Sequence, residues 1–497
     1  MTVERRVKVL PTGQWMVETP PPEAGAGPSA TPGNEAAAPT ATGTSQLRRL
    51  LREFIHEALA YLRQWSEWPR RPGDDLNLHR SAMWLAHADQ VPSLGVVRAH
   101  LQEEPLRTLL RNTGHQWIWH YEYLPELFLE QVGRRSLGQE EIPAGIFAAT
   151  CRDLERELAA GQIRLRRVTA VHGVPAPRRR LDIASGVYLV PYDVTTGPGP
   201  LSDLLWLKYQ RDVRRHVPAI GVLLVQERVV AKADEGKPLL SALDQLRDEG
   251  DTVVGALRLA YGGGVHISAS WVVQLSRFPL VPAVHRGDEE SPETWHEAGG
   301  PGGPRDARRL REAHALLTHP QRSQERQRLR TAFRRYEQAF RLRRPLQNVI
   351  DLVVALEGLY GVRRGELKRR LAQRVALLLA EDGGDAQAVY DQIAAAYDIR
   401  SALVHGRSTE EKLQERLASA VKAITGLGEL QAGDEYEQAA YQAMQRIREL
   451  TRSSLWAFAR LQGFLGGAQR WPKDDEEWDR LVFDHGLRRS LRRAAGL

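Results

Sequence analysis

The sequence has almost no cysteine. Cys151 is the single thiol in 497 residues. One thiol cannot form an internal disulfide and cannot supply a cysteine-rich metal site, so a disulfide-stapled scaffold and a zinc finger are both excluded. We expect Cys151 to be a small buried apolar side chain.

Long apolar runs are missing as well. The longest run, residues 219–225, is far too short to span a bilayer, and the N-terminal residues MTVERRVKVLPTGQW lack the apolar stretch of a secretory signal. We therefore expect a cytoplasmic protein with no membrane partner. His115, His120 and Glu122 do not have the spacing of a zinc or iron site, and we interpret them as packing residues. No metal and no cofactor is expected.

What the chain does contain is typical of a multidomain globular protein. Hydrophobic residues make up 42% and charged residues 26%, and the length predicts two or three domains. The net charge of +7 permits a polyanionic partner. Arginine is concentrated between Arg305 and Arg344, and this stretch could either follow a phosphate backbone or be an ordinary solvated helix surface.

The composition changes along the chain and indicates five segments. Residues 1–45, rich in Pro, Ala, Gly, Ser and Thr, predict a disordered tail, and residues 46–137 a helical region rich in aromatic residues. Residues 138–286 predict a separate α+β domain, which shows no catalytic signature and which we interpret as a sensor or regulator of another part of the chain, and residues 287–304 predict an acidic Gly/Pro linker. Residues 305–497 are helical almost throughout. The predicted fold class is therefore a multidomain α+β region followed by an all-α bundle.

Within the α+β domain we predict a helix near residues 144–160 and strands in five β-type runs. These runs are IRLRRVTAV, SGVYLVPYDV, AIGVLLVQERVV, TVVGALRLAY and VHISASWVVQL. Three glycines, Gly262 to Gly264, separate the last two. Because the following run also looks like a strand, a hairpin turn is favoured over a phosphate-binding loop.

Three consecutive C-terminal helices carry charges where apolar residues are expected. They are predicted near residues 346–360, 366–380 and 386–404, and the charged residues on their apolar faces are Glu357, Arg374 and Arg400. An unpaired buried ion costs several kcal/mol, so such residues should form ion pairs or line a cleft. A structural pair between Glu357 and Arg374 is one interpretation. His405 ends the third helix before Gly406, where the helix dipole favours a cation.

The segment from Arg400 to His405, RSALVH, matches the R-x-x-x-x-H motif of HEPN domains. Together with ALEGLYG (355–361), LAQRVALLL (371–379) and YDIRSALVHG (397–406), it resembles the Apea-like HEPN family of the HEPN ribonuclease superfamily. The resemblance covers about residues 332–461. Many HEPN nucleases have Asn, Asp or His after the motif arginine, whereas this chain has Ser401.

The resemblance implies a metal-independent endoribonuclease that acts as a homodimer on RNA, including transfer RNA, in phage defence or as a toxin-like protein. Arg400 and His405 would be the catalytic residues, and Glu357, Ser401 and Arg374 would support them. Two alternatives remain open. Ser401 would permit an inactive HEPN domain that binds RNA, a nucleotide or a protein partner, and a bundle with a sealed motif would be a structural dimerisation domain.

Overall fold

The computed structural model describes the chain in segments. These are residues 7–9, 15–17, 41–64, 90–104, 106–112, 124–136, 141–193, 220–232, 237–262, 264–276, 278, 284–287, 304–320, 323–340, 344–361, 366–381, 383–405, 409–428 and 433–497. Residues 1–40 form one compact unit and residues 41–497 another. In the first unit β1 (Val7–Val9) pairs antiparallel with β2 (Trp15–Val17), and the prediction of a disordered tail missed these strands. Both strands place two apolar residues around a central one, VKV and WMV, a pattern that favours extended pairing.

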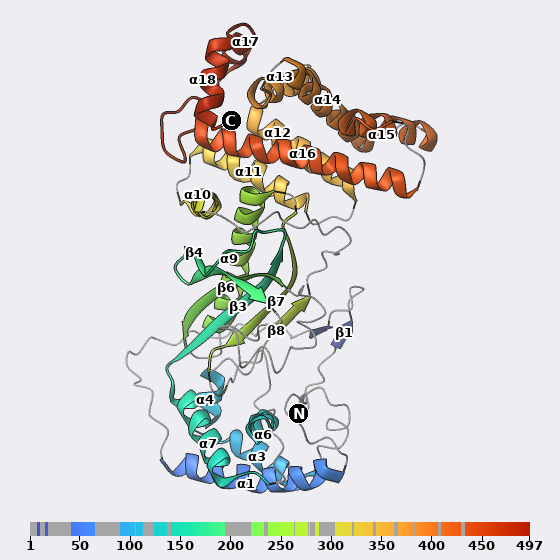
Figure 1. The fold of residues 1–497 in the computed structure, drawn as a ribbon. Coiled ribbons are helices and arrows are strands. Elements are labelled where there is room, and N and C mark those ends of the chain that lie inside the picture. The colour runs from blue at the N-terminus through green and yellow to red at the C-terminus, as the bar shows by residue number, and fades with distance from the viewer. Residues whose placement is uncertain are drawn as a thin grey trace, which may run out of the picture. The chain divides into compact units, whose positions relative to one another are not determined.

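The second unit begins with helices that enclose a core of their own. They are α1 (Ala41–Gln64), α3 (Pro92–Leu101), α4 (Leu106–Asn112), α6 (Leu124–Arg135) and α7 (Ala144–Ala159) (Figure 1). Phe54, Phe128 and Phe147 lie in this core together with Cys151. The prediction that Cys151 is buried is confirmed, and burial raises the pKa of its thiol to about 11. His115, His120 and Glu122 lie outside the described residues.

A six-stranded antiparallel sheet follows, in the order β4-β5-β6-β3-β7-β8. Its strands are β3 (Gln162–His172), β4 (Leu181–Ala184), β5 (Val187–Asp193), β6 (Ile220–Ala231), β7 (His266–Gln274) and β8 (Val284–Gly287). The prediction of strands at four of the five β-type runs, and of an α+β middle region, is confirmed. One face of the sheet packs against the start of α9 (Lys237–Tyr261), where Leu239 and Leu246 contact Ile163 and Leu165 of β3.

The strand predicted at TVVGALRLAY is wrong, because residues 252–261 form the second half of α9. Every residue from Val253 to Ala260 is buried, so the helix shows no alternation of exposed and buried faces in this stretch. A short, fully buried helix segment with β-branched residues cannot be distinguished from a strand by periodicity. The predicted hairpin is wrong for the same reason, since Gly262 and Gly264 connect a helix to a strand.

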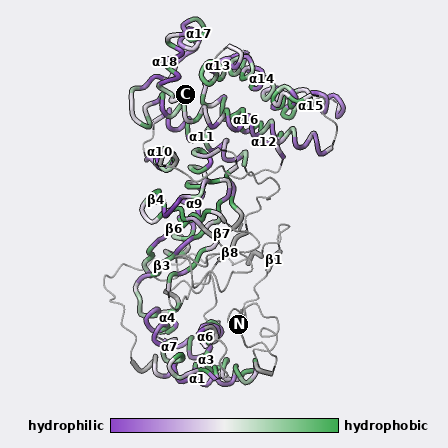
Figure 2. Tube along the Cα trace, in the orientation of Figure 1, coloured by the Kyte–Doolittle hydropathy of each residue, from purple (hydrophilic) through white to green (hydrophobic). Residues whose placement is uncertain are grey.

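The C-terminal region consists of helices, as predicted. They are α10 (Pro304–Thr318), α11 (Gln324–Gln338), α12 (Pro345–Tyr360), α13 (Leu367–Leu379), α14 (Gly383–His405), α15 (Glu410–Thr425), α16 (Asp434–Leu461), α17 (Asp475–Phe483) and α18 (His485–Ala495). The three helices that carry Glu357, Arg374 and Arg400 are α12, α13 and α14. Hydrophobic and hydrophilic residues succeed one another in short stretches along these helices (Figure 2). No helix in the described segments is long and apolar enough to cross a membrane.

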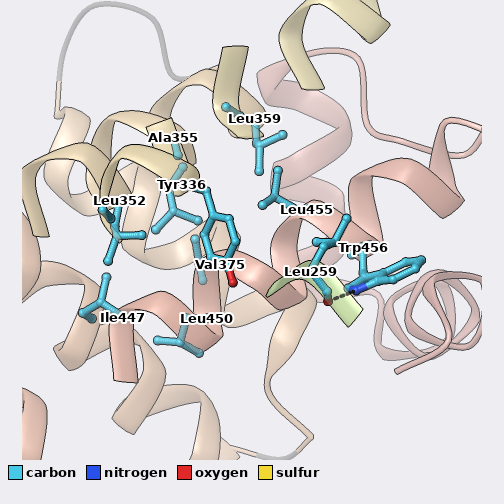
Figure 3. Close-up of a cluster of buried hydrophobic side chains, with 14 of the residues drawn as sticks. Leu259, Tyr336, Leu352, Ala355, Leu359, Val375, Ile447, Leu450, Leu455 and Trp456 are labelled. Atoms are coloured by element: carbon cyan, nitrogen blue, oxygen red, sulfur yellow. Dashed lines mark hydrogen bonds between the residues drawn. The ribbon is translucent and has the colours of Figure 1, made fainter. Parts of the chain in front are cut away.

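The second half of α9 joins the sheet to the C-terminal helices. The indole Nε1 of Trp456 donates a 2.7 Å hydrogen bond to the carbonyl of Leu259, near the end of α9 (Figure 3). The hydroxyl of Tyr336 donates to the carbonyl of Arg258, and the Arg258 guanidinium pairs with Glu337 at 3.0 Å. One hydrophobic cluster accordingly includes residues of the sheet, α9 and the C-terminal helices. The predicted domains 138–286 and 305–497 therefore share a core.

Candidate functional site

Arg400 of α14 and Glu357 of α12 form an ion pair. Nη1 of Arg400 lies 2.8 Å from Oε1 of Glu357, and the two side chains are 27% and 20% exposed. Burial raises the pKa of the Glu357 carboxyl, and the positive charge of Arg400 partly opposes this effect. The sequence suggested a pair between Glu357 and Arg374, and that interpretation is wrong. Glu357 instead holds the motif arginine, at the junction of two packed helices.

Tyr397 completes the surroundings of the Arg400 guanidinium. It lies one turn before Arg400 on α14, and the guanidinium carbon is 5.4 Å from the centre of its ring. This distance is within the range of an attractive cation–π contact. Arg400 therefore has both an acid and an aromatic ring close to its guanidinium. Sequence reasoning missed Tyr397, although the three-residue spacing on a helix could have indicated the contact.

His405 is the last residue of α14 and is exposed. Residues five apart on an ideal helix differ by about 140° around the axis, so Arg400 and His405 do not lie directly above one another. Tyr397, Ser401 and Val404 fall between them on this helical wheel, and Val404 is 55% exposed. The motif thus begins at the half-buried Arg400 and ends at the exposed His405, on an arc of about 140° at the end of α14. The predicted C-cap Gly406 lies outside the described residues.

Arg374 has different partners and a different environment. Its side chain is 6% exposed and pairs with Asp475 of α17. Its Nη1 donates a 2.9 Å hydrogen bond to the carbonyl of Tyr360, at the end of α12. Its guanidinium also lies 5.6 Å from the Trp478 ring. The contacts of Arg374 are those of a helix-capping arginine that attaches α17 to α12 and α13.

Several arginines of the stretch 305–344 also bind protein groups. Arg328 donates to the carbonyls of Gly358 and Leu359 at 3.2 and 2.8 Å, again at the end of α12. Arg335 pairs with Asp351 at 3.0 Å. Arg326 is buried, with its guanidinium 4.3 Å from the Phe464 ring. These three arginines contact groups of the protein itself, so their presence in this stretch does not require an RNA contact.

No metal site is found in the described segments, where no three His, Cys, Asp or Glu side chains form a group that could hold an ion. Glu357, Arg400 and His405 offer a permanent cation, an acid paired with it and, five residues further along α14, an exposed imidazole. A fixed guanidinium can donate two hydrogen bonds to an anionic oxygen, and an imidazole can transfer a proton near neutral pH. These are the groups required for phosphodiester chemistry without a metal.

Comparison with known proteins identifies no relative of this chain. The chain matches no protein-family model, no curated protein and no solved structure.

Proposed function

We propose that this protein is a metal-independent endoribonuclease of the HEPN type. The observation that carries the proposal is the ion pair of 2.8 Å between Arg400 and the partly buried Glu357, with an exposed His405 five residues after Arg400 on the same helix. Burying part of an ion pair gives little or no net stability, so a half-buried arginine at a surface suggests a role in binding. The match of residues 400–405 to the R-x-x-x-x-H motif supports the same conclusion.

In the proposed reaction the ribose 2′-hydroxyl attacks the adjacent phosphorus, and the 5′-oxygen of the next nucleotide leaves. Negative charge grows on the phosphate oxygens, where the guanidinium of Arg400 donates hydrogen bonds. In a dimer, His405 of one copy takes the proton of the attacking hydroxyl and His405 of the other copy gives a proton to the leaving oxygen, so the products are a 2′,3′-cyclic phosphate and a 5′-hydroxyl. Glu357 fixes the orientation of Arg400, and the Ser401 hydroxyl supplies a further hydrogen-bond donor at the same face.

The proposal includes a homodimer and an RNA substrate such as transfer RNA. Because Arg400 and His405 diverge by about 140° on α14, a second motif from a partner copy would complete a site around one phosphate. As an effector in phage defence or a toxin-like system, the protein would use residues 46–286 to sense or regulate.

Cleavage of total RNA and transfer RNA by purified protein in EDTA tests the proposal. Loss of one electrostatic stabiliser lowers a rate on the order of a hundred- to a thousandfold, so Arg400→Ala and His405→Ala should be nearly inactive and folded. Arg416→Ala, an exposed arginine of α15, is the matched control and should cleave like the wild type. Equal cleavage by wild type and Arg400→Ala would refute the assignment.

An inactive binding domain is the second candidate, and Ser401 favours it because it replaces the usual residue after the motif arginine. In that case purified wild type would retard RNA or a nucleotide in a binding assay without cleaving RNA. Arg400→Ala would then lose binding. Toxicity of overexpressed wild type, but not of Arg400→Ala, would instead support the nuclease.

A further inference from the structure

The contact between Tyr397 and Arg400 has no part in the motif that led to the proposed function. Tyr397 is half-buried and packs against the main hydrophobic cluster, and this packing restricts the movement of its ring. The guanidinium carbon of Arg400 lies 5.4 Å from the centre of this ring, and its Nη1 lies 2.8 Å from Oε1 of Glu357. The two neighbours contact Arg400 in different ways.

A carboxylate and an aromatic ring use different parts of a guanidinium. A carboxylate binds the N–H groups at the edge of the guanidinium plane, whereas a ring interacts with the cation without needing those donors. Oε1 of Glu357 lies 2.8 Å from Nη1 of Arg400 but accepts no hydrogen bond from the described residues, so a phosphate competes with this carboxylate for the charge of Arg400 and can bind its N–H groups. When a phosphate displaces the carboxylate, the contact with the ring can therefore persist, and it limits the rotation of a long and flexible side chain.

On the wheel of α14, Tyr397 also lies between Arg400 and His405. Along the axis, Tyr397 lies one turn before Arg400 and His405 ends the helix. We propose that Tyr397 is a positioning residue that restrains the Arg400 guanidinium while a phosphate replaces Glu357 as its partner. This inference rests on the proposed function for its role in catalysis, but the contact itself can be tested without RNA.

The experiment compares Tyr397→Leu, which removes the ring, with Tyr397→Phe, which keeps it. Tyr390→Leu is the matched control, because Tyr390 is a half-buried tyrosine on the same helix, two turns earlier. The first readout is the rate at which phenylglyoxal modifies Arg400 in the full-length protein, followed by peptide mass spectrometry. The second is kcat and KM for cleavage of transfer RNA in EDTA.

An exposed cation–π contact corresponds to a factor of about two to five in an equilibrium or a rate. We expect Tyr397→Leu to raise the modification rate of Arg400 and to lower kcat by about this factor. KM should stay nearly unchanged, and Tyr397→Phe and Tyr390→Leu should behave like the wild type. Thermal melting of each variant, compared with Tyr390→Leu, separates an effect on the fold from one on Arg400.

Three results would overturn the inference. Unchanged modification in Tyr397→Leu would show that the ring does not hold Arg400. A change in KM alone would assign Tyr397 to substrate stacking, and failure of Tyr397→Phe would assign the role to the hydroxyl. If the ring protects Arg400 but the wild type cuts no RNA, the contact stands and the proposed nuclease function fails.

Discussion

Replacing Arg374 by methionine should destabilise the protein without acting on the proposed chemistry. Methionine keeps the apolar stem and removes the guanidinium that donates to the Tyr360 carbonyl at 2.9 Å and pairs with Asp475. A buried acceptor left without its donor costs about 1–3 kcal/mol. The pair with Asp475 adds at most about 1 kcal/mol, because that carboxylate is 52% exposed. The loss in the free energy of unfolding should be about 3 kcal/mol.

Urea unfolding at pH 7.5 measures this loss, and two variants serve as controls. Asp475→Asn should cost less than about 1 kcal/mol, because it removes only the ion pair with the exposed carboxylate and leaves the hydrogen bond from Arg374 to the Tyr360 carbonyl in place. Arg400→Met should cost less than Arg374→Met, since its carboxylate partner can take up a proton more easily than usual. RNA cleavage, normalised to folded protein, should be kept in Arg374→Met and lost in Arg400→Met.

The pH dependence gives a second check on the same pair. Arg374, mainly through its hydrogen bond, holds the pKa of Asp475 below its usual value. The stabilisation by Asp475 is therefore complete above its unfolded pKa and disappears as the pH falls through the lower folded value. The difference between wild type and Arg374→Met should shrink in acid. Equal urea midpoints for the two proteins, or an Asp475→Asn cost as large as that of Arg374→Met, would refute the reasoning.

The helices of the C-terminal region could be predicted from sequence because their signals are local. Apolar residues recur at helical spacing in α12, α13 and α14, and their bounds differ from the prediction by at most three residues. The charges on those apolar faces were also visible. The partner of each charge could not be predicted, because Glu357 could pair with either Arg374 or Arg400 by charge. Only the packing of α14 on α12 brings Arg400, rather than Arg374, next to Glu357.

Contacts between distant segments escaped prediction for the same reason. Asp475 lies 101 residues after Arg374, and nothing in its own neighbourhood indicates a partner. The second half of α9 was mistaken for a strand because residues of the sheet and of the C-terminal helices, Tyr336 and Trp456 among them, bury it together. A local pattern cannot report a surface that a later part of the chain covers.

Three further predictions concern the sheet and its junction with α9. Gly173 has φ +70, and a Cβ there would lie 1.9 Å from the Gly264 carbonyl oxygen, so Gly173→Ala should lower the free energy of unfolding, measured with urea, by several kcal/mol. Gly161→Ala is the control and should cost little, because nothing lies within 4 Å of a Cβ at that position. Trp456→Phe removes the 2.7 Å bond to the carbonyl of Leu259, which keeps its 3.2 Å bond from Arg452, and should cost about 1 kcal/mol in the same assay; an unchanged urea midpoint would contradict this. Finally, burial and the neighbouring His266 lower the pKa of His172 to about 4 from 6.5, and the two rings stack 4.7 Å apart. The unfolded chain then takes up a proton near pH 6.5 that the folded protein accepts only near pH 4, so stability falls as the pH drops through this window, by about 2 kcal/mol at pH 5. His172→Phe keeps an aromatic ring that cannot be protonated and should remove this part of the slope; an NMR titration that gave His172 a pKa near 6.5 would contradict the argument.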